Sequence, residues 1–108
     1  MINPKYAKLL KELETFGTGQ MKCFGYSMTP IFPGDGCLMT YKKQTAYKVG
    51  DIVFCSVHGR FIDAHLITQA GPKGYLISNN HGHDNGWTKK VYGKVIRAEY
   101  GTTIKHFT

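Results

Sequence analysis

The first apolar residues of the chain recur every three or four positions, the spacing of one face of an α-helix. They are Tyr6, Leu9, Leu10, Leu13 and Phe16. Asn3 is a suitable N-cap, Pro4 suits the first helical position, and Gly17 and Gly19 end the pattern. The sequence therefore predicts one N-terminal helix whose apolar face covers the core of the domain.

After Gly19 the pattern changes to short runs rich in β-branched and aromatic residues, separated by turns that contain glycine or proline. These runs predict strands at Met21–Phe24, Cys37–Tyr41, Asp51–Val57, Arg60–Thr68, Tyr75–Ser78 and Lys90–Tyr100. A hairpin is predicted around His58-Gly59, and Asn85-Gly86 is typical of a further turn. Strands at roughly ten-residue spacing with no helix between them predict a mainly β, sandwich or barrel-like core.

The length of 108 residues indicates a single domain, with residues 1–19 as the helix and linker and residues 20–100 as the core. Fourteen Lys and Arg against seven Asp and Glu give a net charge of +7, which suits an acidic partner. The basic residues are scattered along the chain, so a nucleic-acid partner is not favoured.

No apolar run approaches the roughly 20 residues of a membrane-spanning helix, and the N-terminus lacks the apolar stretch of a signal peptide. The sequence thus predicts a soluble cytoplasmic protein. Cys23, Cys37 and Cys55 each lie in an apolar stretch, and no C-x-x-C pair occurs. An odd number of cysteines at this spacing favours buried free thiols over a disulfide framework or a zinc ribbon.

The most informative stretch is Gly25-Tyr26-Ser27-Met28-Thr29-Pro30. It places a serine in a turn bounded by glycine and proline, directly after a short apolar strand. Such a turn can expose the Ser27 hydroxyl and free nearby amides, at Gly25 and Met28, to bind an oxyanion. A serine also needs an adjacent base before it can act as a nucleophile.

Further motifs follow in a recognisable order. They are Gly34-Asp35, Val49-Gly50-Asp51-Ile52-Val53, Ile62-Asp63-Ala64-His65-Leu66-Ile67, Tyr75-Leu76-Ile77-Ser78-Asn79-Asn80 and Val91-Tyr92-Gly93-Lys94-Val95-Ile96. This order, from about Met21 to Ile96, resembles the serine peptidase superfamily of LexA-type repressors, UmuD-like proteins and signal peptidases. The resemblance implies a coiled antiparallel β-sheet domain with one short N-terminal helix.

The resemblance also implies a catalytic base on the strand after the second Gly-Asp pair. That strand has no lysine but has His65, as in the Ser–His variant of the superfamily. An alternative alignment puts Ala64 at the base position and His65 at the position of a family arginine. Strand alternation places these two residues on opposite faces and does not decide between them. At neutral pH an unperturbed histidine is mostly a free base, which suits the role.

A third catalytic residue is implied at Asp84, where the family has a late aspartate that could orient His65. Asp63 is a rival for that role, because it lies two residues from His65 on the same strand. Asn79 stands where the family has its first aspartate, which removes a charge. His81-Gly82-His83-Asp84 could supply metal ligands, but the chain lacks a recognised zinc-ligand spacing. No metal and no cofactor is therefore predicted.

The expected function is a stand-alone serine peptidase of bacteria or their phages, acting on a protein or peptide substrate with Ser27 as nucleophile and His65 as base. The alternative is a catalytically inactive domain of the same fold that binds a peptide or protein partner. UmuD-like relatives dimerise, so a homodimer is a further expectation. Only about twenty residues precede the core, too few for the DNA-binding domain of LexA-type repressors.

Overall fold

The predicted helix forms at Pro4–Phe16 (α1) in the computed structural model, which describes residues 3–107. The Asn3 side chain accepts a hydrogen bond from the Lys5 backbone N–H at 3.0 Å, and Gly17 ends the helix in the left-handed conformation (φ 75°). Leu9 and Leu13 are buried, so this face of α1 packs on the sheet as the spacing predicted. Gly19 instead belongs to the first strand.

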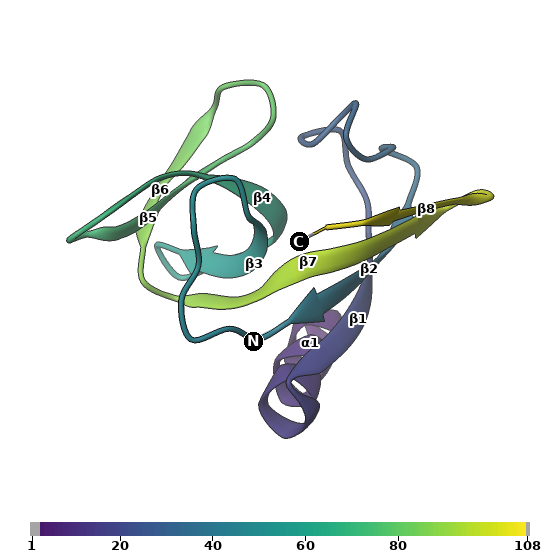
Figure 1. Ribbon diagram of the computed structural model, residues 1–108, viewed down its shortest axis with the longest axis horizontal. Coiled ribbons are helices and arrows are strands. Elements are labelled where there is room, and N and C mark those ends of the chain that lie inside the picture. Colours follow the sequence, from purple (N-terminus) through teal and green to yellow (C-terminus); the bar gives the residue numbers. More distant parts are fainter. Residues whose placement is uncertain (1–2, 108) are drawn as a thin grey trace.

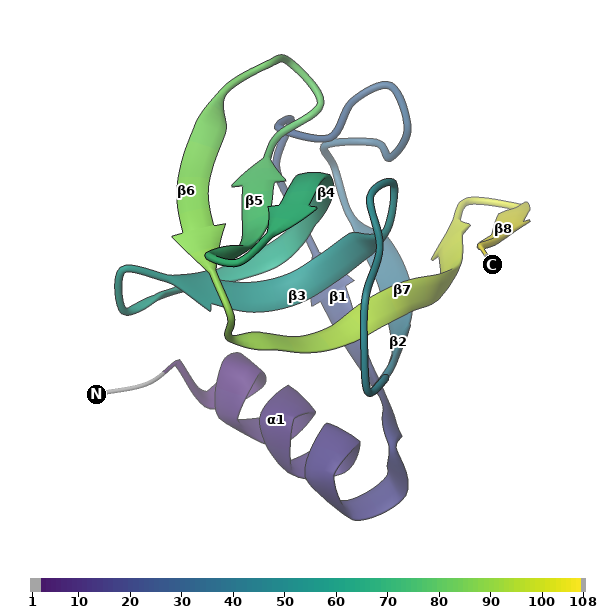
Figure 2. The same cartoon turned by 60° about the vertical axis from the view of Figure 1, so that its left-hand side comes forward.

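Eight strands follow the helix (Figure 1). They are β1 (Thr18–Cys23), β2 (Cys37–Lys42), β3 (Ile52–Val57), β4 (Arg60–Gly71), β5 (Gly74–Ser78), β6 (Asp84–Thr88), β7 (Val91–Tyr100) and β8 (Thr103–His106). They form one antiparallel sheet in the order β1-β2-β7-β3-β4-β5-β6, and β8 pairs with β7. The sheet is strongly curled, and α1 lies across one end of it (Figure 2). The expected fold class is thus confirmed: a mainly β, coiled antiparallel sheet with one short helix.

Six of these strands were predicted, with ends that differ by a few residues, and β6 and β8 were not. The turn predicted at Asn85-Gly86 is wrong, because both residues lie inside β6. Ser78 pairs with Asp84 and Ile77 pairs with Gly86, so Asn85 is an extra residue in the ladder. Gly86 has a φ of 133°, which a β-bulge accommodates as readily as a turn does.

The core is centred on β3, whose six residues are all buried. Phe54 faces α1 and lies among four aromatic rings: Tyr6, Tyr41, Phe61 and Tyr92. The opposite face of β3 contributes Val53, Cys55 and Val57 to a second, smaller cluster with Ile67 and Ile77. β3 is buried on both faces and is paired with β4 and β7. The position of this buried strand therefore sets the position of its two neighbours. Within residues 3–107, no helix is both long and apolar enough to cross a membrane.

Candidate active site

Ser27 lies in the loop between β1 and β2, residues 24–36, which we call the serine loop. Gly25 has a φ of 112°, and its N–H donates to the Gly34 carbonyl at 3.0 Å, which closes the base of the loop. Gly34 also permits a close approach, since a Cβ there would collide with the Tyr26 ring. Met28 is buried beneath the turn and Ser27 is half-buried.

The amides of this turn differ in their hydrogen bonds. The Gly25 amide is used by Gly34, so in this structure Gly25 shapes the turn rather than offering a free donor. Within residues 3–107, the backbone amides of Ser27 and Met28 donate to no backbone carbonyl. Two free amides beside a serine hydroxyl are the donors that an oxyanion requires.

A second loop, residues 79–83, supports the serine loop from outside. The Asn80 amide donates to the Ser27 carbonyl at 2.8 Å, and the Asn80 side chain donates to the Thr29 carbonyl at 3.0 Å. The His81 Nε2 atom lies 3.0 Å from the Tyr26 carbonyl, which can only accept, so this nitrogen carries a proton. Asn79 Oδ1 in turn accepts from the amides of His81 and His83. Asn79 therefore has a structural role in this loop.

His65 comes from β4, directly after a β-bulge. His65 pairs with Val53 and Ile62 pairs with Cys55, so Asp63 and Ala64 together face the single residue Phe54. The Asp63 carbonyl accepts a hydrogen bond from the buried Tyr41 hydroxyl at 2.7 Å. The bulge interrupts the alternation assumed for this strand, and Ala64 and His65 both line the same cavity. Bulges often re-aim a side chain next to a functional site.

The cavity has a volume of about 300 Å³, and both Ser27 and His65, from segments far apart in the sequence, line it. Its wall combines polar and apolar groups and comes mostly from the serine loop, β1, β2 and β4. The apolar lining includes Cys23, Met28, Phe32, Cys37, Met39, Phe61, Ile62 and Ala64, and the polar lining includes Arg60, Asp63 and Asn85.

Burial sets the protonation of His65. It lowers the pKa of His65 from its ordinary value of 6.5, and the backbone of Ala64 and the negative charge of Asp63 oppose this shift only in part. The imidazole is therefore neutral at pH 7. Its Nδ1 atom is buried and has no hydrogen-bond partner among residues 3–107, and the same holds for Asn85 Oδ1 at the cavity wall. Unpartnered buried polar atoms are rare and indicate a strained or functional group.

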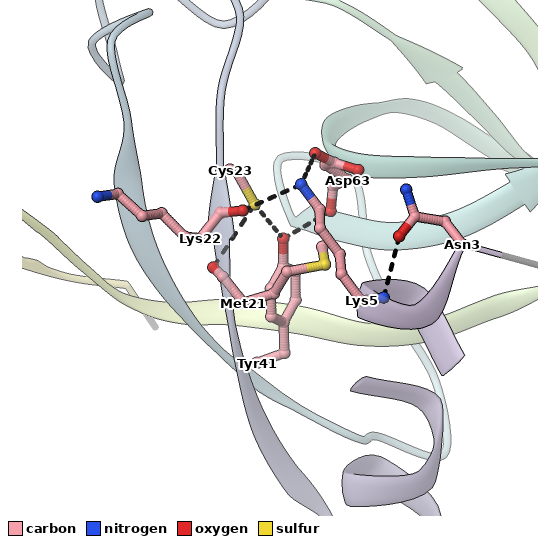
Figure 3. A network of polar contacts seen from close by, with 7 residues as sticks. All are labelled: Asn3, Lys5, Met21, Lys22, Cys23, Tyr41 and Asp63. Atoms are coloured by element: carbon pink, nitrogen blue, oxygen red, sulfur yellow. Dashed lines mark hydrogen bonds and ion pairs between the residues drawn. The ribbon is translucent and has the colours of Figure 1, made fainter. Parts of the chain in front are cut away.

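The two aspartates considered for a catalytic role have other contacts. Asp84 Oδ1 accepts a hydrogen bond from Ser78 Oγ at 2.6 Å, so this carboxylate is engaged within the β5–β6 hairpin. Asp63 Oδ2 lies 3.7 Å from Lys5 Nζ of α1 (Figure 3). The role of Asp84 in orienting His65 stays a prediction, since its side chain is hydrogen-bonded to Ser78.

Neither a metal site nor a known relative assigns a further role to these residues. In the described part of the chain, no three His, Cys, Asp or Glu side chains are grouped so that they could hold a metal ion. No protein-family model matches the chain, and neither does any curated protein or solved structure.

Tyr41→Phe tests whether the Tyr41 hydroxyl holds the β4 bulge. The variant leaves the Asp63 carbonyl without its donor, and we expect a loss of about 1–2 kcal/mol in the free energy of unfolding. The matched control is Tyr92→Phe, which removes the hydroxyl that pairs with Ser56 Oγ at 2.9 Å but leaves the bulge untouched. Denaturant unfolding measures both losses. Only Tyr41→Phe should shift the NMR signals of the His65 ring, and equal shifts in both variants would contradict the role of Tyr41.

Proposed function

We propose that this protein is a serine hydrolase that cleaves a peptide bond, with Ser27 as nucleophile and His65 as general base. The observation that carries the proposal is the shared cavity: a serine in a glycine-bounded turn and a neutral histidine on a distant strand line the same space of about 300 Å³. The order of motifs from Met21 to Ile96 supports the same assignment, in its Ser–His form.

The chemistry follows from these groups. His65 takes the proton of the Ser27 hydroxyl as Ser27 Oγ attacks the carbonyl carbon of the substrate. The amides of Ser27 and Met28 are the donors proposed for the negatively charged carbonyl oxygen. His65 then gives its proton to the leaving amine, and a water molecule releases the acyl group from Ser27.

The experiment that tests this function is labelling with a fluorophosphonate, which reacts with activated serines. We expect the reagent to modify wild-type protein at Ser27, as mapped by mass spectrometry after digestion. Ser56 and Ser78 are the other serines of the chain and are buried and hydrogen-bonded, so they serve as internal controls. A folded protein that is not labelled at Ser27, yet binds peptides, would favour the non-catalytic peptide-binding domain.

The rate of labelling is also expected to depend on pH in a defined direction. Protonated His65 cannot accept the Ser27 proton, so the rate falls as the pH drops through the pKa of His65. Burial lowers that pKa, so half of the maximal rate is expected below pH 6.5, with a plateau at neutral pH. A midpoint well above pH 6.5, measured over pH 4–9, would contradict His65 as the base.

A further inference from the structure

Two of the three cysteines face each other at the base of the serine loop. Cys23 is the last residue of β1, Cys37 is the first residue of β2, and the two are directly paired in the antiparallel register. Residues so paired have Cα atoms about 4.5–5.5 Å apart, which lies within the range that a disulfide spans. Both thiols are free and buried, and both line the cavity that also contains Ser27.

We infer that Cys23 and Cys37 are a redox-sensitive pair that forms a reversible disulfide across the base of the serine loop, with a peroxide as the oxidant. The cavity gives a small oxidant a route to both sulfur atoms, although both lie within the folded domain. This inference concerns the thiols alone and does not rest on the proposed hydrolase activity.

The third cysteine is a natural contrast. Cys55 lies on β3 in the second apolar cluster, among Val53, Val57, Ile67 and Ile77. It pairs with Ile62 on β4 and with Val91 on β7, so no cysteine stands opposite it. Cys55 also does not line the cavity. A specific reaction of the Cys23–Cys37 pair must therefore leave Cys55 unchanged.

The contacts of the two thiols indicate which of them is oxidised first. The Tyr41 hydroxyl donates to the Asp63 carbonyl, so the Cys23 thiol, whose sulfur is 3.3 Å from the Tyr41 oxygen, keeps its proton as a donor (Figure 3). Burial raises the pKa of Cys37 and the Glu99 carboxylate adds to this rise, while the Glu99 backbone N–H and the Lys105 ammonium oppose it in part. Cys37 is thus the first sulfur to be oxidised.

The reaction balances as a two-electron oxidation. The Cys37 thiolate attacks one oxygen of hydrogen peroxide, the O–O bond breaks, and hydroxide leaves and is protonated to water. The product is a sulfenic acid on Cys37. The Cys23 sulfur then attacks the Cys37 sulfur, the S–O bond breaks, and the hydroxyl group leaves as water with the Cys23 proton. Two thiols and one peroxide yield one disulfide and two waters.

The disulfide would close residues 24–36 into a covalent loop that contains Ser27. Closing a loop of this size reduces the conformational freedom of the unfolded chain more than that of the folded protein. The melting temperature of the oxidised protein is therefore expected to rise by about 10 °C.

The test treats the fully reduced full-length chain with hydrogen peroxide at pH 8, then alkylates the remaining thiols and digests without reductant. Mass spectrometry should find one peptide pair linked through Cys23 and Cys37, with Cys55 alkylated. Cys55→Ser should form the same link and show the same rise in melting temperature, which dithiothreitol should reverse. Cys37→Ser should form no link and show no rise.

Several outcomes would overturn the inference. They are a disulfide that includes Cys55, a link between two chains, sulfinic acid at Cys23 or Cys37 without a link between them, and thiols that stay reduced at excess peroxide. A Cys23–Cys37 link that left the melting temperature unchanged would show that the disulfide does not stabilise the protein by closing the serine loop. Because the readouts are covalent and thermal, they are independent of whether Ser27 is catalytic.

Discussion

Ser27→Ala is expected to abolish peptide cleavage, and His65→Ala is expected to slow it by about 10²–10⁴-fold. The serine variant loses the atom that forms the acyl intermediate, while the histidine variant keeps the nucleophile but loses its proton acceptor. The assay incubates each protein with a diverse peptide pool at neutral pH and detects new termini by mass spectrometry. It also gives the residues that flank the cleaved bond, which define the specificity of the cavity.

His106→Ala is the matched control for the histidine variant. His106 is exposed on β8 and does not line the cavity with Ser27 and His65, so its loss should leave the cleavage rate unchanged. All variants should keep the melting temperature of the wild type within a few degrees, because the Ser27 and His65 side chains line a cavity and do not belong to the buried apolar clusters. Cleavage that persists in Ser27→Ala would rule out Ser27 as the nucleophile.

Phe54→Ala is expected to give the largest loss of stability, about 3–5 kcal/mol in the free energy of unfolding. Phe54 is fully buried, and its ring centroid lies 5.3–6.0 Å from those of four aromatic neighbours. The substitution leaves a cavity between α1 and the sheet that these rings cannot fill. Small domains have a total stability of about 5–15 kcal/mol, so a large share of it would be lost.

Phe16→Ala is the control for this change. The same atoms are removed, but Phe16 is 76% exposed at the end of α1, so the expected effect is within about 0.5 kcal/mol. Thermal or urea unfolding measures both variants. A loss in Phe54→Ala no greater than that in Phe16→Ala would contradict the central role of the aromatic cluster.

Features that depend on local sequence were predictable. The helix follows from the spacing of Leu9 and Leu13 and from the Asn3 cap, and the hairpin at His58-Gly59 follows from a two-residue turn. The position of Ser27 in a tight turn also followed from its flanking glycine and proline. In each case the deciding contacts lie within a few residues along the chain.

Features that depend on distant contacts were missed. β6 contains Gly86 and β8 is short and exposed, so neither has the apolar alternation of a strand, and pairing with β5 and β7 stabilises them. The bulge at Asp63 accepts a hydrogen bond from the Tyr41 hydroxyl on another strand. The support that Asn80 gives to the serine loop spans more than fifty residues. The Asn79-Asn80 motif indicated that this segment mattered, but not that Asn80 would bind the serine loop.

The central place of β7 in the sheet has a consequence for the synthesis of the protein. β7 lies between β2 and β3, yet its residues 91–100 are translated after those of β1–β6. Until they leave the ribosome, β2 and β3 each lack one of their two neighbours, and the two parts of the sheet cannot join. Pairs such as Leu38 with Glu99 close long segments of chain, which is typical of slow folding. Until β7 is complete, β2 and β3 therefore each expose an unpaired strand edge, which is a template for unwanted pairing with other chains.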